Sequence, residues 1–249
     1  MEIAKLKKEL IEQRKSKFKG NVYHYSQVNF AYNSNKIEGG KLNENETEEI
    51  FITNSFIPKS DDTIKLDDLT EMKNHFRLFD YCLDTLDDNL SKEMIINMNK
   101  ILKRNTTDED NPRYNVGGFK KIPNKIGLIN VVGTTAPENV EKEIDDLLSK
   151  YHKIKNITIE DIIDFHYKFE IIHPFGDGNG RVGRMIMFRE CLKNNIMSFI
   201  ILDNDKSFYL RGLRNYKTDK MFLIDTIKHE QDIYEKVINE MLNFDLENK

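Results

Sequence analysis

The chain has 249 residues, of which 38 are basic and 42 acidic, giving a net charge of -4. Because the charges nearly balance, no polycationic surface is expected and nucleic acid is a poor candidate partner. The hydrophobic fraction of 39% suffices for a core, whereas no apolar run approaches the roughly 20 residues of a membrane span. The charged N-terminus does not resemble a secretory signal. We therefore expect a soluble cytoplasmic protein that does not associate with a membrane.

Apolar residues at helical spacing predict an all-α fold. The expected helices cover about residues 2–17, 23–38, 67–85, 91–103, 137–151, 158–172, 180–194, 206–215 and 219–243. Gly39 suits a left-handed helix end, Ser91 and Thr158 suit N-caps, and Pro137 suits a first helical turn. No flexible linker divides the chain, so we expect one compact domain.

Two further features complete this outline. A polar stretch over residues 43–62 is expected to carry no regular element. Prolines and glycines between Asn111 and Asn130 exclude a helix there and predict a loop or small β-hairpin. Cys82 and Cys191 lack a CxxC spacing and lie in apolar surroundings, which predicts two reduced, buried thiols.

One segment, HPFGDGNGRVGR at residues 173–184, combines several chemically useful groups. Its alternating glycines predict a tight loop with inward-facing N–H groups at the start of a helix, which is an anion-binding arrangement. Arg181 and Arg184 share a helix face and suit two phosphates, while Asp177 offers a hard oxygen ligand for Mg²⁺. His173 titrates near neutral pH and can move a proton. The loop therefore combines a base, a metal ligand and a phosphate cradle.

Two other interpretations of this segment are weaker. Each feature alone is typical of an ordinary turn, but a turn needs neither the paired arginines nor the histidine. Gly178, Gly180 and Gly183 also match the dinucleotide fingerprint, with Asp203 as the ribose ligand. That fingerprint requires a strand immediately before it, whereas residues 165–172 fit a helix, so it remains a minor alternative.

The segment resembles the signature of the Fic family, HPFx(D/E)GNGRxxR, at every defined position. The resemblance implies a Fic-fold helical bundle with a small β-hairpin flap. It divides the chain into an N-terminal helical region at residues 1–66 and a Fic core at residues 67–240, with the fido domain at about 91–235. It also implies a protein adenylyltransferase, which transfers AMP from ATP to a Ser, Thr or Tyr hydroxyl of a target protein and of itself.

The resemblance also implies roles for individual residues. His173 would be the catalytic base, and Asp177 would hold Mg²⁺ at the ATP phosphates. The anion hole would comprise Gly178, Asn179 and Gly180, and the β- and γ-phosphates would contact Arg181 and Arg184. The related Doc kinases carry lysine where this chain has Gly180, which favours AMP transfer over phosphoryl transfer.

Outside the signature, the resemblance implies a flap over Asn115–Ile122, where the residues facing the substrates would be Phe119, Lys120, Lys121 and Ile122. Two lysines there depart from the more apolar flap of the family. Tyr209 and Tyr216 match positions that flank the adenine, although Tyr209 can equally be a core aromatic residue.

A second motif, Ser34-Asn-Lys-Ile-Glu38-Gly39, is by itself an ordinary helix end. Upstream of a Fic core it resembles the inhibitory (S/T)xxxE(G/N) motif, whose glutamate pairs with the second signature arginine. Glu38 would then occupy the γ-phosphate position on Arg184 and autoinhibit the enzyme. Two alternatives stay open: a hydrolase that removes AMP at the same site, and an ATP-binding interaction module without turnover. The sequence leaves the target protein and the formation of a homodimer undecided.

Overall fold

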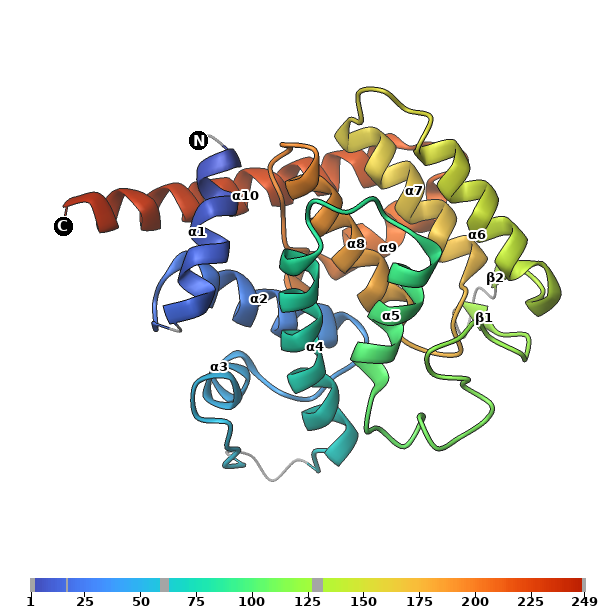
Figure 1. Ribbon diagram of the computed structural model, residues 1–249, viewed down its shortest axis with the longest axis horizontal. Helices are drawn as coiled ribbons and strands as arrows, with labels where there is room; N and C mark the ends of the chain where they lie inside the picture. Colours follow the sequence, from blue (N-terminus) through green and yellow to red (C-terminus); the bar gives the residue numbers. More distant parts are fainter. Residues whose placement is uncertain (1–2, 17, 59–62, 127–131, 248–249) are drawn as a thin grey trace. The chain divides into compact units, whose positions relative to one another are not determined.

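The computed structural model describes residues 3–16, 18–58, 63–126 and 132–247 and is predominantly helical (Figure 1). The chain folds into two compact units: Met1–Ile64 with Phe188–Lys249, and Lys65–Met187. Among the described residues, no helix combines the length and apolar character needed to cross a membrane.

The first unit contains the N-terminal and C-terminal helices. Its elements are α1 (Ile3–Ser16), α2 (Val22–Ile37), α3 (Glu44–Thr53), the 3-10 turn η1 (Asp203–Asp205), α9 (Lys206–Asn215) and α10 (Met221–Glu247). Helix α2 packs against α1, α3 and α10, and α9 packs against α10. Gly39 has φ +93° and ends α2 with a left-handed turn, as expected from the sequence.

The second unit carries the signature segment. It contains α4 (Leu66–Asp84), α5 (Lys92–Lys103), β1 (Lys125–Ile126), β2 (Val132–Gly133), α6 (Pro137–Tyr151), α7 (Ile159–Ile172) and the first turns of α8 (Asn179–Lys193). The expected caps are present: the Ser91 hydroxyl accepts from the Met94 N–H, and Thr158 forms a capping box with Asp161. Helix α5 packs on α4 and α6, and α6 packs on α7, as the neighbouring ribbons in Figure 1 show.

Helix α3 corrects the expectation that residues 43–62 carry no regular element. Asn43 and Glu46 form a capping box, in which the Asn43 side chain accepts from the Glu46 N–H and the Glu46 carboxylate accepts from the Asn43 N–H, both at 2.9 Å. The reciprocal bonds satisfy two donors at the helix start, and Ile50 anchors the helix in the core. The polar composition of this stretch gives little helical periodicity, although the capping-box residues that begin the helix are present in the sequence.

The β-hairpin lies after the stretch expected to form the flap. Lys125 pairs with Gly133 and Ile126 with Val132 in an antiparallel ladder, whereas residues 115–122 form turns and irregular backbone. Asn115 and Gly117 have positive φ angles of 49° and 78°, which are incompatible with a strand, and Pro123 has no N–H to donate. The part of the expected loop at 127–130 lies outside the described residues.

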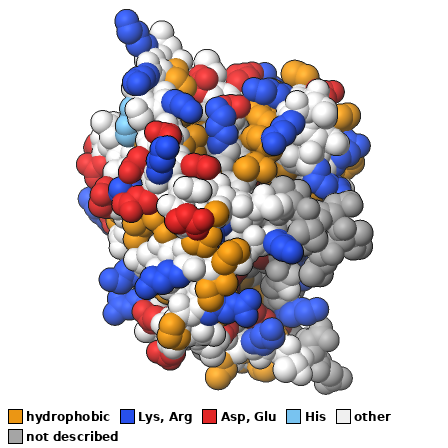
Figure 2. Space-filling model, turned by 90° about the vertical axis from the view of Figure 1, so that its right-hand side faces the viewer, with side chains coloured by type: hydrophobic (Ala, Val, Ile, Leu, Met, Phe, Trp, Pro, Cys, Tyr) orange, Lys and Arg blue, Asp and Glu red, His pale blue; other side chains and the backbone are white. Residues whose placement is uncertain are grey.

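Buried side chains and surface charges agree with the composition. Cys82 and Cys191 are free, buried thiols, and burial raises the pKa of Cys191. Figure 2 shows Lys and Arg side chains interspersed with Asp and Glu over the viewed face. The presence of both signs on this face agrees with the nearly balanced charge of the sequence.

Candidate active site

The candidate site begins where α7 ends, at His173. This residue has φ +51° and ψ 61°, and its N–H donates to the Phe169 carbonyl at 2.9 Å to close the last turn. Pro174 follows and cannot extend the helix, so the chain turns sharply here. The His173 side chain is 19% exposed, with Nδ1 3.9 Å from a Glu170 carboxylate oxygen. An imidazole therefore stands at the helix end with partial access to solvent.

Side-chain amides close the loop that follows. The Asn179 amide accepts from the Phe175 N–H at 2.8 Å and donates to the Phe175 carbonyl at 2.9 Å. Phe175 is fully buried, and Asn99 donates to the Asp177 carbonyl at 2.9 Å. Gly178 has φ +83°, a conformation that L-residues rarely adopt. The Asn179 side chain, expected in the anion hole, is thus engaged in holding the loop.

The loop leads directly into the N-terminus of α8. Helix α8 starts at Asn179, and the Val182 N–H donates to the Gly178 carbonyl at 3.0 Å. The first N–H groups of a helix lack intrahelical acceptors and carry a partial positive charge. Gly180 lies in this first turn without a side chain. The backbone here has the properties of the expected anion-binding loop.

A cluster of charged residues surrounds Asp177. Lys103 Nζ lies 2.6 Å from Asp177 Oδ2 and also contacts Asp108 and Glu71. Arg181 contacts Glu71 and lies 3.1 Å from the same Asp177 oxygen. These cations hold the pKa of Asp177 at about 2, although partial burial of the carboxylate opposes its ionisation. Asp177 is therefore fully ionised at neutral pH.

Three members of this cluster were not identified from the sequence. Glu71 belongs to α4, Lys103 ends α5, and Asp108 lies in the following turn. Their distance from the signature along the chain leaves no local pattern that reveals them. Only the packing of α4 and α5 brings them to Asp177.

Arg184 is buried next to two neutral histidines. Burial is the main cause that lowers the pKa of His75 and of His166 to about 3, and the Arg184 charge contributes in both cases. His166 lies on α7 against α8, where a Cβ at Gly183 would come within 2.8 Å of its ring. The sequence indicates that His166 is close to the site, whereas it gives no such signal for His75. Two uncharged imidazoles therefore lie near Arg184.

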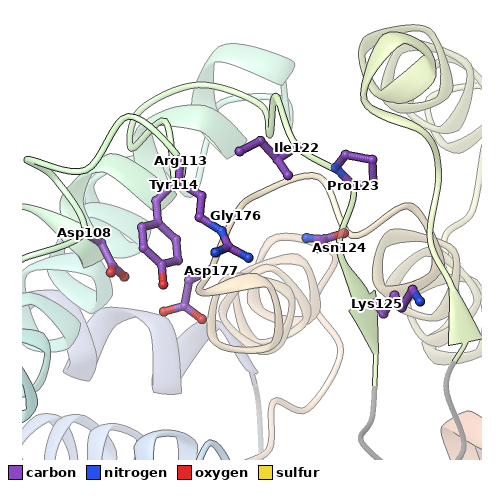
Figure 3. Close-up of a pocket in the computed structure, with 9 residues that line it drawn as sticks. All are labelled: Asp108, Arg113, Tyr114, Ile122, Pro123, Asn124, Lys125, Gly176 and Asp177. Carbon is purple, nitrogen blue, oxygen red and sulfur yellow. The ribbon is translucent and has the colours of Figure 1, made fainter.

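A pocket of about 560 Å³ opens beside the signature loop (Figure 3). Asp177 and Gly176 form one side, and residues 108, 113, 114 and 122–125 form the other. Figure 3 shows the Arg113 guanidinium, the Tyr114 hydroxyl and the Asp177 carboxylate all directed into this space. Arg113 and Tyr114 were not identified from the sequence. The pocket is large enough for a polar ligand of nucleotide or peptide size.

The expected flap residues have different environments. The ring centroids of Phe119 and Phe175 lie 5.9 Å apart, and Ile122 lines the pocket. Lys120 points inward, where its ammonium donates to Asn124, Thr134 and the Ile172 carbonyl. Burial lowers the pKa of Lys120 to about 8. Lys121 is exposed.

The remaining expected residues belong to the first unit. Ser34 is buried near the end of α2, and Glu38 is the exposed C-cap residue that precedes Gly39. Tyr209 lies on α9, and Tyr216 follows that helix. Their proposed contacts with the signature, which lies in the second unit, remain predictions.

Comparisons with known proteins point to one family. Residues 89–191 match the Fic/DOC family. A probable protein adenylyltransferase from Aquifex aeolicus is 29% identical over 87 residues, which cover 35% of this chain and 27% of that protein. The protein adenylyltransferase Fic from Nematostella vectensis is 39% identical over 82 residues, which cover 31% of this chain and 19% of that protein. The chain thus aligns with less than a third of the length of these curated relatives.

Solved structures share the fold over nearly the whole chain. A Fic-domain signalling protein from Bacteroides thetaiotaomicron superposes with a TM-score of 0.74 at 21% identity, covering 94% of each chain. Fic-1 from Caenorhabditis elegans gives a TM-score of 0.68 at 18% identity, covering 97% of this chain and 73% of that one. These likenesses confirm the expected helical fold. Residues 89–191, which include the complete signature at 173–184, are similar to the Fic/DOC family.

Proposed function

We propose that the protein is an adenylyltransferase that transfers AMP from ATP to a hydroxyl side chain of a target protein. The observation that carries this proposal is the signature loop, where His173, the ionised Asp177 and the start of α8 follow one another beside a pocket. The names of the curated relatives support the same activity. Self-modification is part of the proposal.

In this reaction His173 is the general base. The imidazole takes the proton of the target hydroxyl, and the hydroxyl oxygen forms a bond to the α-phosphorus of ATP. The bond between the α-phosphorus and the bridging oxygen to the β-phosphate breaks, and pyrophosphate leaves. The half-buried position of His173 at a helix end supports this role, because the ring is held in place and still reachable.

The phosphates would bind at the start of α8. The N–H groups of Gly178 and Gly180 would face the phosphate oxygens, with the guanidinium groups of Arg181 and Arg184 supplying positive charge. Asp177 fits a magnesium ligand, because it is an ionised oxygen donor whose side chain is 45% exposed beside the pocket. Bound Mg²⁺ would neutralise phosphate charge.

The proposal includes inhibition by Glu38. A carboxylate held on Arg184 would occupy the position of the γ-phosphate and misalign the α-phosphate. Support comes from the Ser34–Gly39 motif and from its position at the end of α2. A displacement of about 1 Å at the reacting centre can cost roughly 10²-fold in rate.

The primary experiment uses ATP labelled at the α-phosphate, with the purified protein and a cell lysate. The parent protein should label itself or a target, and His173→Ala should reduce the rate by roughly 10²–10⁴-fold while retaining ATP binding. His152→Ala is a matched control, because His152 is an exposed residue at the end of α6. Release of AMP from a pre-labelled protein would indicate the hydrolase instead, and ATP binding without either reaction would indicate an interaction module.

A second experiment tests the inhibition. Glu38→Gly should raise the initial rate of AMP transfer at saturating ATP and Mg²⁺, because Arg184 becomes available to the γ-phosphate. Arg184→Ala removes a phosphate ligand together with the partner of Glu38, so this variant should not be activated. Equal or lower rates in Glu38→Gly would refute inhibition and leave the assignment of the signature loop intact.

A further inference from the structure

Lys103 occupies the centre of three carboxylates. Its side chain is 4% exposed, and its ammonium contacts Glu71 and lies 2.6 Å from oxygens of both Asp108 and Asp177. Oxygen atoms of these three acids lie within 4.8 Å of one another, a spacing that a divalent cation could bridge. A lysine ammonium therefore stands where three hard oxygen donors converge.

The charges of this cluster nearly balance. Three carboxylates face Lys103 and Arg181, leaving one negative charge in excess. Both cations contact Oδ2 of Asp177, so a ligand that binds through Oδ1 need not displace either. The two contacts hold the carboxylate in one orientation beside the pocket.

We propose that Lys103 is a positioning residue that acts as an internal counter-cation for Asp177. Its ammonium occupies the space among the carboxylates and suppresses divalent-cation binding there in the nucleotide-free protein. Mg²⁺ then reaches Asp177 only together with the phosphates of a nucleotide, which supply the additional oxygen ligands. This inference rests on the proposed function where it takes the nucleotide to be ATP. The behaviour of the cation site does not depend on that function.

Replacing Lys103 changes the charge of the cluster in a defined direction. In Lys103→Met the three carboxylates keep only Arg181, so the excess negative charge rises from one to two. Affinity for hard divalent cations increases with the number of ligand charges. A purely structural ion pair predicts the opposite, because loosening the carboxylates weakens any site they form.

The test is a titration of the nucleotide-free protein with Mn²⁺ alone, followed by the loss of the free-ion electron paramagnetic resonance signal. We expect weak binding by the parent protein and a Kd about tenfold lower or more in Lys103→Met. Lys103→Gln should behave in the same way if the methionine variant does not fold, whereas Lys103→Arg should retain the weak binding of the parent. Lys100→Met, which removes an exposed lysine from the same helix, should have no effect.

Tight Mn²⁺ binding by the parent, or folded neutral variants with unchanged or weaker binding, would overturn the proposal. The measurement on the parent requires no variant, so the proposal remains testable if substitutions at residue 103 prevent folding. Failure to detect AMP transfer would refute the proposed function without altering the Mn²⁺ result. The two ideas can therefore fail separately.

Discussion

The contact between the signature loop and the segment before the hairpin predicts a large effect for Gly176→Ala. A Cβ at residue 176 would lie 2.8 Å from both the Cα and the carbonyl oxygen of Tyr114. These are backbone atoms and cannot rotate away. Tyr114 is also held by a hydrogen bond from its N–H to the Asn111 carbonyl at 3.0 Å. One of the two segments must move to admit a methyl group.

The size of that movement follows from the contact. An ordinary Cβ contact begins near 3.4 Å, so the backbones must separate by about 0.6 Å, the difference from 2.8 Å. Overpacking of this kind typically costs about 1–3 kcal/mol of folding stability. His173 and Asp177 belong to the same loop, and a displacement near 1 Å costs roughly 10²-fold in rate. We expect transfer to fall by at least about tenfold.

Thermal unfolding and initial AMP-transfer rates measure both consequences. Gly133→Ala is the control, because a Cβ at this glycine of β2 meets no atom within 4 Å. The control should match the parent in both assays. If Gly176→Ala kept the parent's melting temperature and rate, the close approach of Tyr114 to the loop would not constrain the site, and the reasoning from this contact would be wrong.

Three other substitutions test separate parts of the structure. Asp177→Asn should reduce AMP transfer, with partial rescue by excess Mg²⁺ in a metal titration, because the amide keeps the shape but loses the charge. Burial raises the pKa of Glu230 to about 7, because the folded protein favours the neutral carboxyl. The resulting contribution to folding stability is fully present below about pH 4.5 and is lost as the pH rises through 7. At pH 8.5, Glu230→Gln should therefore have a larger free energy of unfolding than the parent, by up to about 3 kcal/mol, and a higher melting temperature. The exposed Glu240→Gln should change neither quantity. Lys120→Met should lower the melting temperature because it removes the donor to three oxygens, at a cost of about 1–3 kcal/mol or more, and the exposed Lys121→Met should leave it unchanged.

The helices were predictable from the sequence because their signals are local. Apolar spacing and the caps at Ser91 and Thr158 lie within a few residues of the structure they produce. The signature loop was predictable for the same reason, since its amide, carboxylate and glycines are consecutive. Helix α3 has an equally local start signal in Asn43 and Glu46. Because few of its buried residues are apolar, the helical spacing of hydrophobic residues is weak there.

The surroundings of the loop were not predictable in this way. The Lys103 ammonium is 74 residues from Asp177 along the chain, and no period relates two positions so far apart. Lys120, expected at the substrate surface, points inward because the turns at Asn115 and Gly117 reverse the backbone before the hairpin. Its burial depends on acceptors from the end of α7, which a pattern along one segment cannot reveal.

This division of information has a chemical consequence for the site. The signature specifies the groups that would meet ATP, and its Arg181 supplies part of the charge around Asp177. The rest comes from Lys103 on α5, which in turn contacts Glu71 on α4. A chain with the same twelve-residue signature and a neutral residue in place of Lys103 would present an extra negative charge at the same carboxylate. Its affinity for divalent cations and its need for a nucleotide to bind them would then differ. An identical signature therefore does not imply an identical affinity of this carboxylate for a divalent cation, because part of the charge around it comes from packing between helices.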